Sequence, residues 1–145
     1  MLVKEIMTKS PICCAPTDTL EQVAKVMLEH DCGAIPIFAS TGLVGMITDR
    51  DIVCRAVATG TRTGASTASE IMSKPVFTVR DDDDVQNAVN LMKTKQVRRL
   101  PVVDKKGKVV GIVAPSDLAP IFASTNVGDF LLAVSYWSRK AVAVT

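Results

Sequence analysis

A hydroxyl and a carboxylate stand three residues apart where an apolar run ends, in Gly45-Met46-Ile47-Thr48-Asp49-Arg50-Asp51. If the run is a buried strand, Thr48 and Asp51 lie at the start of the following helix. A carboxylate can accept both hydroxyls of a ribose, while Thr48 and the free N–H groups of a helix start suit a phosphate. The segment therefore indicates a nucleotide-binding corner. Taken alone, the same spacing is also typical of residues that only cap the helix.

Other side chains give little support for catalysis. The run Asp81-Asp82-Asp83-Asp84 precedes an expected helix start near Val85, and carboxylates there cap free N–H groups and favour the positive end of the helix dipole. We interpret the run as capping rather than as a metal site. The one histidine, His30, falls near the end of an expected helix and is interpreted as a surface residue. We therefore expect no enzyme activity, no catalytic residue and no metal site.

The cysteines favour an intracellular protein. The four of them, at positions 13, 14, 32 and 54, form no C-x-x-C motif. This pattern is typical of reduced, packed thiols in the cytosol. The adjacent Cys13 and Cys14 leave a redox-sensing thiol open as an alternative, which adjacency alone does not support.

The sequence contains an internal repeat, and its two copies must position these residues. Glu5-Ile6-Met7-Thr8-Lys9 recurs 65 residues later as Glu70-Ile71-Met72-Ser73-Lys74, and Ala34-Ile35-Pro36-Ile37 recurs as Arg99-Leu100-Pro101-Val102. After one inserted residue, Val44–Ile47 matches Val110–Val113, and Asp51 matches Asp117. Units of about 55 residues are marginal alone, so we expect the two to bury a shared face against each other.

Each copy predicts the order strand, helix, strand, strand, helix. Apolar residues at 20, 23, 24, 27 and 28 have helical spacing, with Asp18 as the expected N-cap, and positions 85, 88, 89 and 92 repeat the pattern. Brief strands are expected at 12–15 and 76–79 and hairpins at 35–47 and 100–113. A short helix should follow each hairpin, at 49–58 with Gly60 as its stop and at 116–123.

Domain boundaries follow from the repeats. We expect a first domain at 1–60, a linker at 61–67, a second domain at 68–124 and an extension at 125–145. If the extension is helical, one face carries Val127, Phe130, Leu131, Val134 and Trp137. That face either packs back on the body or forms a dimer contact.

Composition excludes several protein classes. The 145 residues are 48% hydrophobic with a net charge of +2, which argues against disorder and against an electrostatic footprint for nucleic acid or an anionic membrane. Every apolar run is far shorter than the roughly 20 residues of a membrane span. The first residues contain an early acidic side chain and no apolar region typical of a secretory signal. We expect a soluble, cytoplasmic protein.

Several motifs together resemble a tandem pair of cystathionine-β-synthase (CBS) domains over roughly residues 3–124. They are the paired Ile-Met-(Thr/Ser) starts, the segments Ile35-Pro36-Ile37 and Leu100-Pro101-Val102, and the motif ending at Asp51. The resemblance implies an α/β (α+β) fold of two pseudo-twofold-related β-α-β-β-α units packed through their sheets. It also implies two clefts between the repeats, where adenine nucleotides or other adenosyl ligands bind.

The resemblance also assigns residues to these clefts. Asp51 would hold the ribose of one ligand and Thr48 its ribose or phosphate, with Arg50 in the same motif. The pocket for the adenine base would be lined by Thr8, Ser10, Ile12, Ala34 and Ile35. The second site would use Ser73, Val76, Phe77, Arg99, Leu100 and Asp117, and we expect it to bind more weakly because Ala114 replaces the hydroxyl. Arg98 and Arg99 would serve a phosphate in either cleft, or would form a solvated strand edge.

These implications predict a stand-alone regulatory module that senses an adenosine-containing ligand without catalysis. The ligand would be AMP, ADP, ATP, S-adenosylmethionine or NAD, and no cofactor would be required. The resemblance further implies a homodimer that acts on a separate regulated protein. Two alternatives remain: a dimeric interaction scaffold with empty clefts, and a cysteine-based redox sensor.

Overall fold

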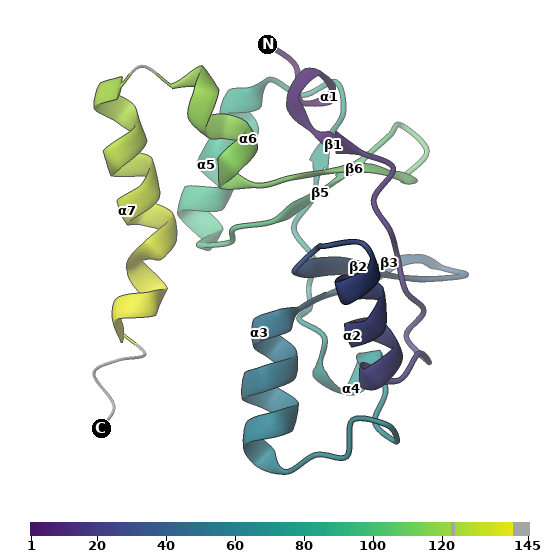
Figure 1. Ribbon diagram of the computed structural model, residues 1–145. Coiled ribbons are helices and arrows are strands. Elements are labelled where there is room, and N and C mark those ends of the chain that lie inside the picture. The colour runs from purple at the N-terminus through teal and green to yellow at the C-terminus, as the bar shows by residue number, and fades with distance from the viewer. Residues whose placement is uncertain (123, 141–145) are drawn as a thin grey trace. The chain divides into compact units, whose positions relative to one another are not determined.

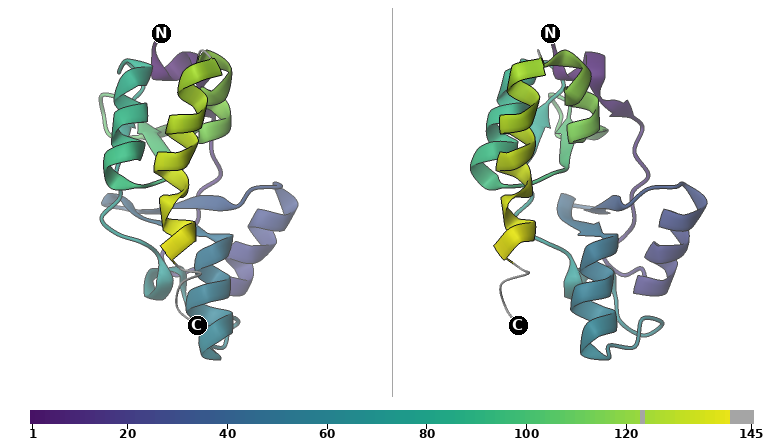
Figure 2. Two further views of the ribbon diagram at one scale, coloured as in Figure 1. Left: turned by 90° about the vertical axis from the view of Figure 1, so that its left-hand side faces the viewer. Right: turned by 60° about the vertical axis from the view of Figure 1, so that its left-hand side comes forward.

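The computed structural model describes residues 1–122 and 124–140, which form two compact units (Figures 1 and 2). One unit contains Pro11–Val76, and the other contains Met1–Ser10 together with the chain from Phe77 onward. We call them the Asp51 unit and the Asp117 unit. The compact units divide the chain differently from the sequence repeats, because the first ten residues of the first repeat join the second repeat.

The Asp51 unit is built on one hairpin, which pairs β2 (Ala34–Ala39) with β3 (Gly42–Thr48) from Ala34↔Thr48 to Ala39↔Gly42. Single bridges extend it on both sides: Cys14 lies parallel to Ile37, and Ser73 lies antiparallel to Met46. The helical segments are α2 (Leu20–Glu29), α3 (Asp49–Asp51), a π-helical turn (Ile52–Ala56), a 3-10 turn (Val57–Thr59) and α4 (Ala68–Ile71).

The Asp117 unit repeats this plan with a fuller sheet in the order β1-β6-β5-β4, of which only the β4–β5 pair is parallel. Its strands are β1 (Thr8–Lys9), β4 (Val79–Arg80), β5 (Leu100–Val103) and β6 (Val109–Val113). Its helical segments are α1 (Val3–Ile6), α5 (Val85–Lys95), α6 (Pro115–Leu118), a 3-10 turn (Ala119–Ile121) and α7 (Ser124–Lys140).

The predicted helical faces form the two cores. In α5 all four predicted positions are buried, namely Val85, Ala88, Val89 and Met92. In α2, Leu20, Val23 and Met27 are buried, whereas Ala24 and Leu28 are exposed, the latter by 83%. The inward face of α2 is therefore narrower than the sequence suggested. Both predicted hairpins are confirmed, as is the helix stop at Gly60, whose φ of 73° suits a glycine.

Four local expectations differ from the structure. The N-cap of α2 is Thr19, whose Oγ1 accepts the Gln22 N–H at 3.2 Å, while Asp18 accepts the Ala15 N–H at 2.8 Å. Segment 12–15 contributes only the Cys14 bridge instead of a strand. The helix expected at 49–58 changes to a π turn after Asp51, and the one expected at 116–123 begins at Pro115 and ends as a 3-10 turn.

A short helix docks in each unit on the loop ahead of the long helix. In the Asp117 unit, the Val3 N–H donates to the Asp83 carbonyl at 2.9 Å. In the Asp51 unit, the Ala68 N–H donates to the Asp18 carbonyl at 2.8 Å. The strand positions that follow match as well, since Thr8 pairs with Ile112 and Ser73 with Met46. The start of each repeat is therefore packed on the body of the other repeat.

The C-terminal helix α7 belongs to the Asp117 unit and runs beside α5 (Figures 1 and 2). Phe130 and Val134 are buried in the core, and the Phe130 ring lies 5.3 Å from that of Phe122. These two residues pack on the body of the Asp117 unit. Leu131, predicted on the same face, is 45% exposed, and the Trp137 side chain lies outside the described part. Among the described residues, no helix is long and apolar enough to cross a membrane.

Candidate functional site

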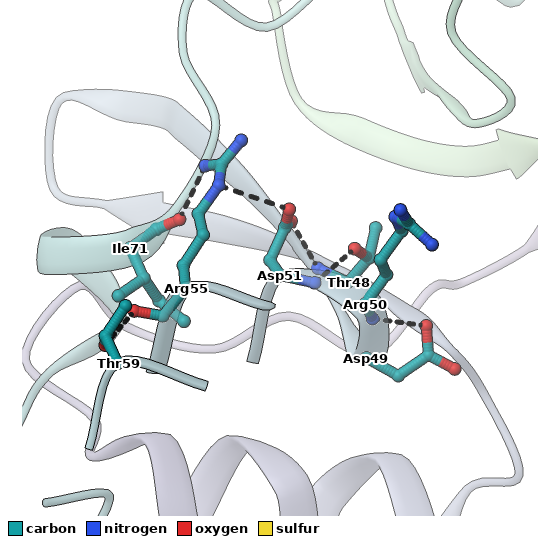
Figure 3. A network of polar contacts seen from close by, with 7 residues as sticks. All are labelled: Thr48, Asp49, Arg50, Asp51, Arg55, Thr59 and Ile71. Atoms are coloured by element: carbon teal, nitrogen blue, oxygen red, sulfur yellow. Dashed lines mark hydrogen bonds and ion pairs between the residues drawn. The ribbon is translucent and has the colours of Figure 1, made fainter. Parts of the chain in front are cut away.

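Thr48 and Asp51 hold each other at the start of α3 (Figure 3). Thr48 Oγ1 accepts the Asp51 N–H at 3.1 Å, and Asp51 Oδ2 accepts the Thr48 N–H at 2.9 Å. The helix-capping interpretation is therefore confirmed. The cap leaves acceptor positions on Asp51 unused, because an ionised carboxylate has about four of them and the cap uses one.

A third residue, Arg55, completes this corner and was missed by the sequence interpretation. Its Nε lies 3.7 Å from Asp51 Oδ1, and its Nη1 donates to the Ile71 carbonyl at 2.9 Å (Figure 3). The Asp51 side chain is 15% exposed and that of Arg55 is 50% exposed. The signal was present in the sequence, since opposite charges four residues apart on a helix face one another.

The corner of the Asp117 unit keeps the carboxylate and loses the other two side chains. Asp117 Oδ2 accepts the Ala114 N–H at 2.8 Å, as Asp51 does with Thr48. Ala114 offers no hydroxyl, and Ile121 stands where the repeat offset would place an arginine. In the described part of the chain, Asp117 forms no ion pair. The weaker binding expected here stays a prediction.

The two units group the remaining candidate residues differently from the sequence interpretation. Thr8 and Ser10, assigned with Asp51, belong to the Asp117 unit, where Thr8 pairs with Ile112 of β6. Ser73 and Val76, assigned with Asp117, belong to the Asp51 unit. The exchange of repeat starts is the physical reason. The assigned grouping is kept for Ile12, Ala34, Ile35 and Arg50 in the Asp51 unit, and for Phe77, Arg98, Arg99 and Leu100 in the Asp117 unit.

Burial separates the candidates with exposed side chains from those whose side chains lie in a core. The side chains of Ile35 and Leu100 are fully buried in the cores of their units, so in this structure they act as core residues. Ile12 is 40% exposed, and Thr8, Ser10 and Arg50 are exposed as well. Arg98 and Arg99 are exposed, and Arg99 Nη1 donates to the Arg98 carbonyl at 2.8 Å. Lys95 Nζ lies 5.1 Å from the centre of the Phe77 ring.

The acidic run is used for capping and ion pairing. Asp84 caps α5 by accepting the Gln86 N–H at 2.8 Å, which lowers the pKa of its carboxyl. Asp82 pairs with Arg80 at 2.9 Å, and the hydrogen bonds from Arg80 lower the Asp82 pKa. The part of the chain that the structure describes has no group of three or more His, Cys, Asp or Glu side chains able to hold a metal ion.

Three cysteine thiols have raised pKa values, which favour the neutral thiol over the thiolate. Burial raises the pKa of Cys14 to about 11, with a further contribution from the Asp18 charge. Burial also raises the pKa of the Cys13 and Cys32 thiols. Because the thiolate is the reactive form, these shifts disfavour the redox-sensor alternative.

Two curated relatives show how far the similarity extends. The chain is 39% identical over 120 residues to an uncharacterized protein, MK0525, of Methanopyrus kandleri, covering 82% of this chain and 61% of that protein. It is 35% identical over 132 residues to hypoxic response protein 1 of Mycobacterium tuberculosis, covering 90% of this chain and 92% of that protein. The chain thus spans less than two thirds of the first relative and most of the second.

Solved structures share the fold. A crystal structure of hypoxic response protein I with two coordinated zinc ions matches with a TM-score of 0.75 and 35% identity, covering 85% of this chain and all of that chain. The CBS domain pair of protein MJ0100, crystallised with 5′-methylthioadenosine and S-adenosyl-L-methionine, matches with a TM-score of 0.75 and 33% identity, covering 84% of this chain and 95% of that chain.

The family model for the CBS domain matches twice, at residues 3–57 and 68–124. Each match ends after one of the two aspartate corners, and each begins at the short helix that docks on the other repeat. The mixed α/β units, the repeated corners and both matches agree: the chain belongs to the CBS domain family and carries a pair of CBS domains.

Proposed function

We propose that this chain is a regulatory module that binds an adenosine-containing ligand at the Asp51 and Asp117 corners and performs no catalysis. The observation that carries the proposal is the equivalence of the two corners. In each, a carboxylate at the third helical position is held by one backbone N–H, at 2.9 Å in one unit and 2.8 Å in the other. Each carboxylate is fixed in orientation and keeps acceptor positions for a ribose diol.

The partial exposure of the corners supports this role. Asp51 and Asp117 are both partly exposed, and Thr48 keeps its hydroxyl at the same helix start. The related MJ0100 domain pair was crystallised with two adenosyl compounds, which makes this ligand class the first to test. A ligand would regulate a partner only as far as it binds two conformations of the module with different affinities.

Isosteric substitution of the aspartates tests the proposal. Asp51→Asn and Asp117→Asn keep an oxygen that can accept the capping N–H, but each replaces an acceptor for the diol with a donor. A hydrogen bond to a charged group contributes about 1.5–3 kcal/mol, so each variant should weaken its own site by at least about tenfold. Calorimetric titration with AMP, ATP, adenosine and S-adenosylmethionine would measure both sites.

Unfolding measurements provide an independent control. A ligand present at about 100 times its dissociation constant should add about 2.7 kcal/mol to the free energy of unfolding. Absence of a shift with every adenosyl compound would contradict the proposal and favour the interaction scaffold. Unchanged affinity in both asparagine variants, with binding intact, would move the ligand away from these corners.

A further inference from the structure

Arg55 joins two parts of the Asp51 unit that are far apart in sequence. Its guanidinium bridges the Asp51 carboxylate and the carbonyl of Ile71, the last residue of α4 (Figure 3). Its own backbone is held too, since Thr59 Oγ1 donates to the Arg55 carbonyl at 3.0 Å. Arg55 is therefore anchored at three points while half of its side chain stays exposed.

The anchored guanidinium keeps donors to spare. Guanidinium carries five N–H donors, of which Nε faces Asp51 and one hydrogen of Nη1 is given to Ile71. Among the described residues, no hydrogen-bond partner contacts Nη2, which points away from Ile71 in Figure 3. A planar group with free N–H donors on one edge is suited to bidentate binding of phosphate.

The comparison with the other unit shows why this cation matters. The Asp117 unit has Arg98 and Arg99 ahead of its hairpin, where the Asp51 unit has Gly33 and Ala34. Conversely, Ile121 of the Asp117 unit takes the place of Arg55. Each unit thus has arginine at a position in the sequence where the other has none. In the Asp51 unit, Arg55 is the cation that contacts the carboxylate itself.

We propose that Arg55 is the specificity-determining residue of the Asp51 corner: its outer N–H edge binds the phosphate of the ligand, so that the corner selects a nucleotide over the nucleoside. This inference rests on the proposed function. The ion pair compensates the Asp51 charge, which would otherwise repel a phosphate bound nearby. Since the side chain is already anchored, little rotamer entropy is lost when the phosphate binds.

Arg55→Ile, which introduces the residue found in the Asp117 corner, is the direct test. In an Asp117→Asn background, where only the Asp51 corner is measured, calorimetry would compare AMP with adenosine. We expect AMP affinity to fall by at least about tenfold and adenosine affinity to change by less than about twofold. Arg55→Lys keeps the charge but loses the planar fork, so its AMP affinity should lie between those of the parent and Arg55→Ile.

Arg62→Ile is the matched control, because Arg62 is an exposed arginine of the same unit whose replacement removes the same charge. It should leave both affinities unchanged. Hydrogen exchange at the Ser73 amide, which donates to the Met46 carbonyl at 2.8 Å, reports whether each variant keeps the bridge between Ser73 and Met46 in place. If Arg55→Ile does not fold, Arg55→Lys provides the test. A lower ratio of AMP affinity to adenosine affinity than in the parent supports the inference, and an unchanged ratio overturns it.

The outcomes separate the two proposals. Equal loss of AMP and adenosine in Arg55→Ile would reduce Arg55 to a structural support of Asp51 and overturn the inference. Unchanged AMP affinity in a folded variant would overturn it as well. Failure of the parent protein to bind any of the adenosyl compounds would instead overturn the proposed function, whereas binding of S-adenosylmethionine without AMP would overturn this inference and leave the proposed function in place.

Discussion

The Asp51 unit and the Asp117 unit share one packing scheme and differ in the polar residues at its edge. Met72 covers Gly45 in the first, and Met7 covers Gly111 in the second. In both, the short helix comes from the start of the other repeat. The corners differ, with Thr48 and Arg55 in one unit and Ala114 and Ile121 in the other. The shared packing fixes the positions of the two aspartates, whereas the side chains around each aspartate differ in their polarity and charge.

The largest difference in stability should come from α7, which only the Asp117 unit has. Phe130 is 1% exposed and contacts Phe122, and truncation of a buried Phe typically costs about 3–5 kcal/mol. We expect Phe130→Ala to lower the free energy of unfolding by that amount in chemical denaturation. Leu132→Ala on the same helix is the control, because Leu132 is 58% exposed and should change stability little. A loss below about 1 kcal/mol for Phe130→Ala would contradict the docking of α7.

The glycines beneath the two methionines should give the next largest effect. A Cβ at Gly45 would lie 2.7 Å from Met72 Cγ, and one at Gly111 would lie 2.8 Å from Met7 Cγ and 3.1 Å from the Thr8 carbonyl oxygen. Overpacking of this kind costs about 1–3 kcal/mol, so Gly45→Val and Gly111→Val should both destabilise the protein. Denaturation curves would measure the cost.

A second substitution identifies the clash. Met72→Ala should recover part of the loss in Gly45→Val, because it removes the atoms that the new side chain meets. Met7→Ala should recover less in Gly111→Val, since the Thr8 carbonyl belongs to the backbone and stays in place. Additive losses in the Gly45 and Met72 double variant would show that the two residues do not meet.

The repeat in the sequence predicted much of this fold because both copies carry the same local signals. Helical spacing located α2 and α5, and turn residues located both hairpins. The exchange of repeat starts was not predictable in the same way. Glu5–Lys9 and Glu70–Lys74 are so alike that local sequence does not indicate which body each one packs on. Thr8 and Ser73 consequently lie in a different compact unit from the aspartates with which they were grouped.

At the two corners, too, contacts within one helical turn could be predicted from the local sequence, whereas contacts that depend on tertiary packing could not. The hydroxyl-x-x-Asp spacing predicted the cap at Thr48 and Asp51, because a capping box is a contact within one turn. The pairing of Arg55 with Asp51 could have been predicted from their spacing of four residues, whereas the hydrogen bond of Arg55 to the Ile71 carbonyl depends on the docking of α4. Ile35 and Leu100 were assigned to the ligand sites by the family resemblance, and the burial of their side chains depends on the cores around them.

The smallest predicted effect concerns Cys14. This residue is equivalent to Val79 of the other unit, because Cys14 pairs in parallel with Ile37 as Val79 does with Val102. With its pKa raised to about 11 from an ordinary value of 9.0, roughly 0.1% of Cys14 is thiolate at pH 8. Keeping the thiol neutral contributes stability that is present below the unfolded pKa and is lost as pH rises toward the folded value. Alkylation of the native protein by iodoacetamide, followed by peptide mass spectrometry, should be slow at Cys14 and should rise about tenfold per pH unit between 8 and 10.

Cys14→Val separates the packing of this position from its chemistry. Because valine is the residue used at the equivalent site, the variant should change the free energy of unfolding by less than about 1.5 kcal/mol, the limit typical of volume-conserving swaps in a core. Its stability should also lose the dependence on alkaline pH that the neutral thiol confers. Rapid labelling of native Cys14 at pH 7, or loss of folding in Cys14→Val, would mean that the Asp51 unit uses this position for more than packing, and the equivalence of the two units would fail there.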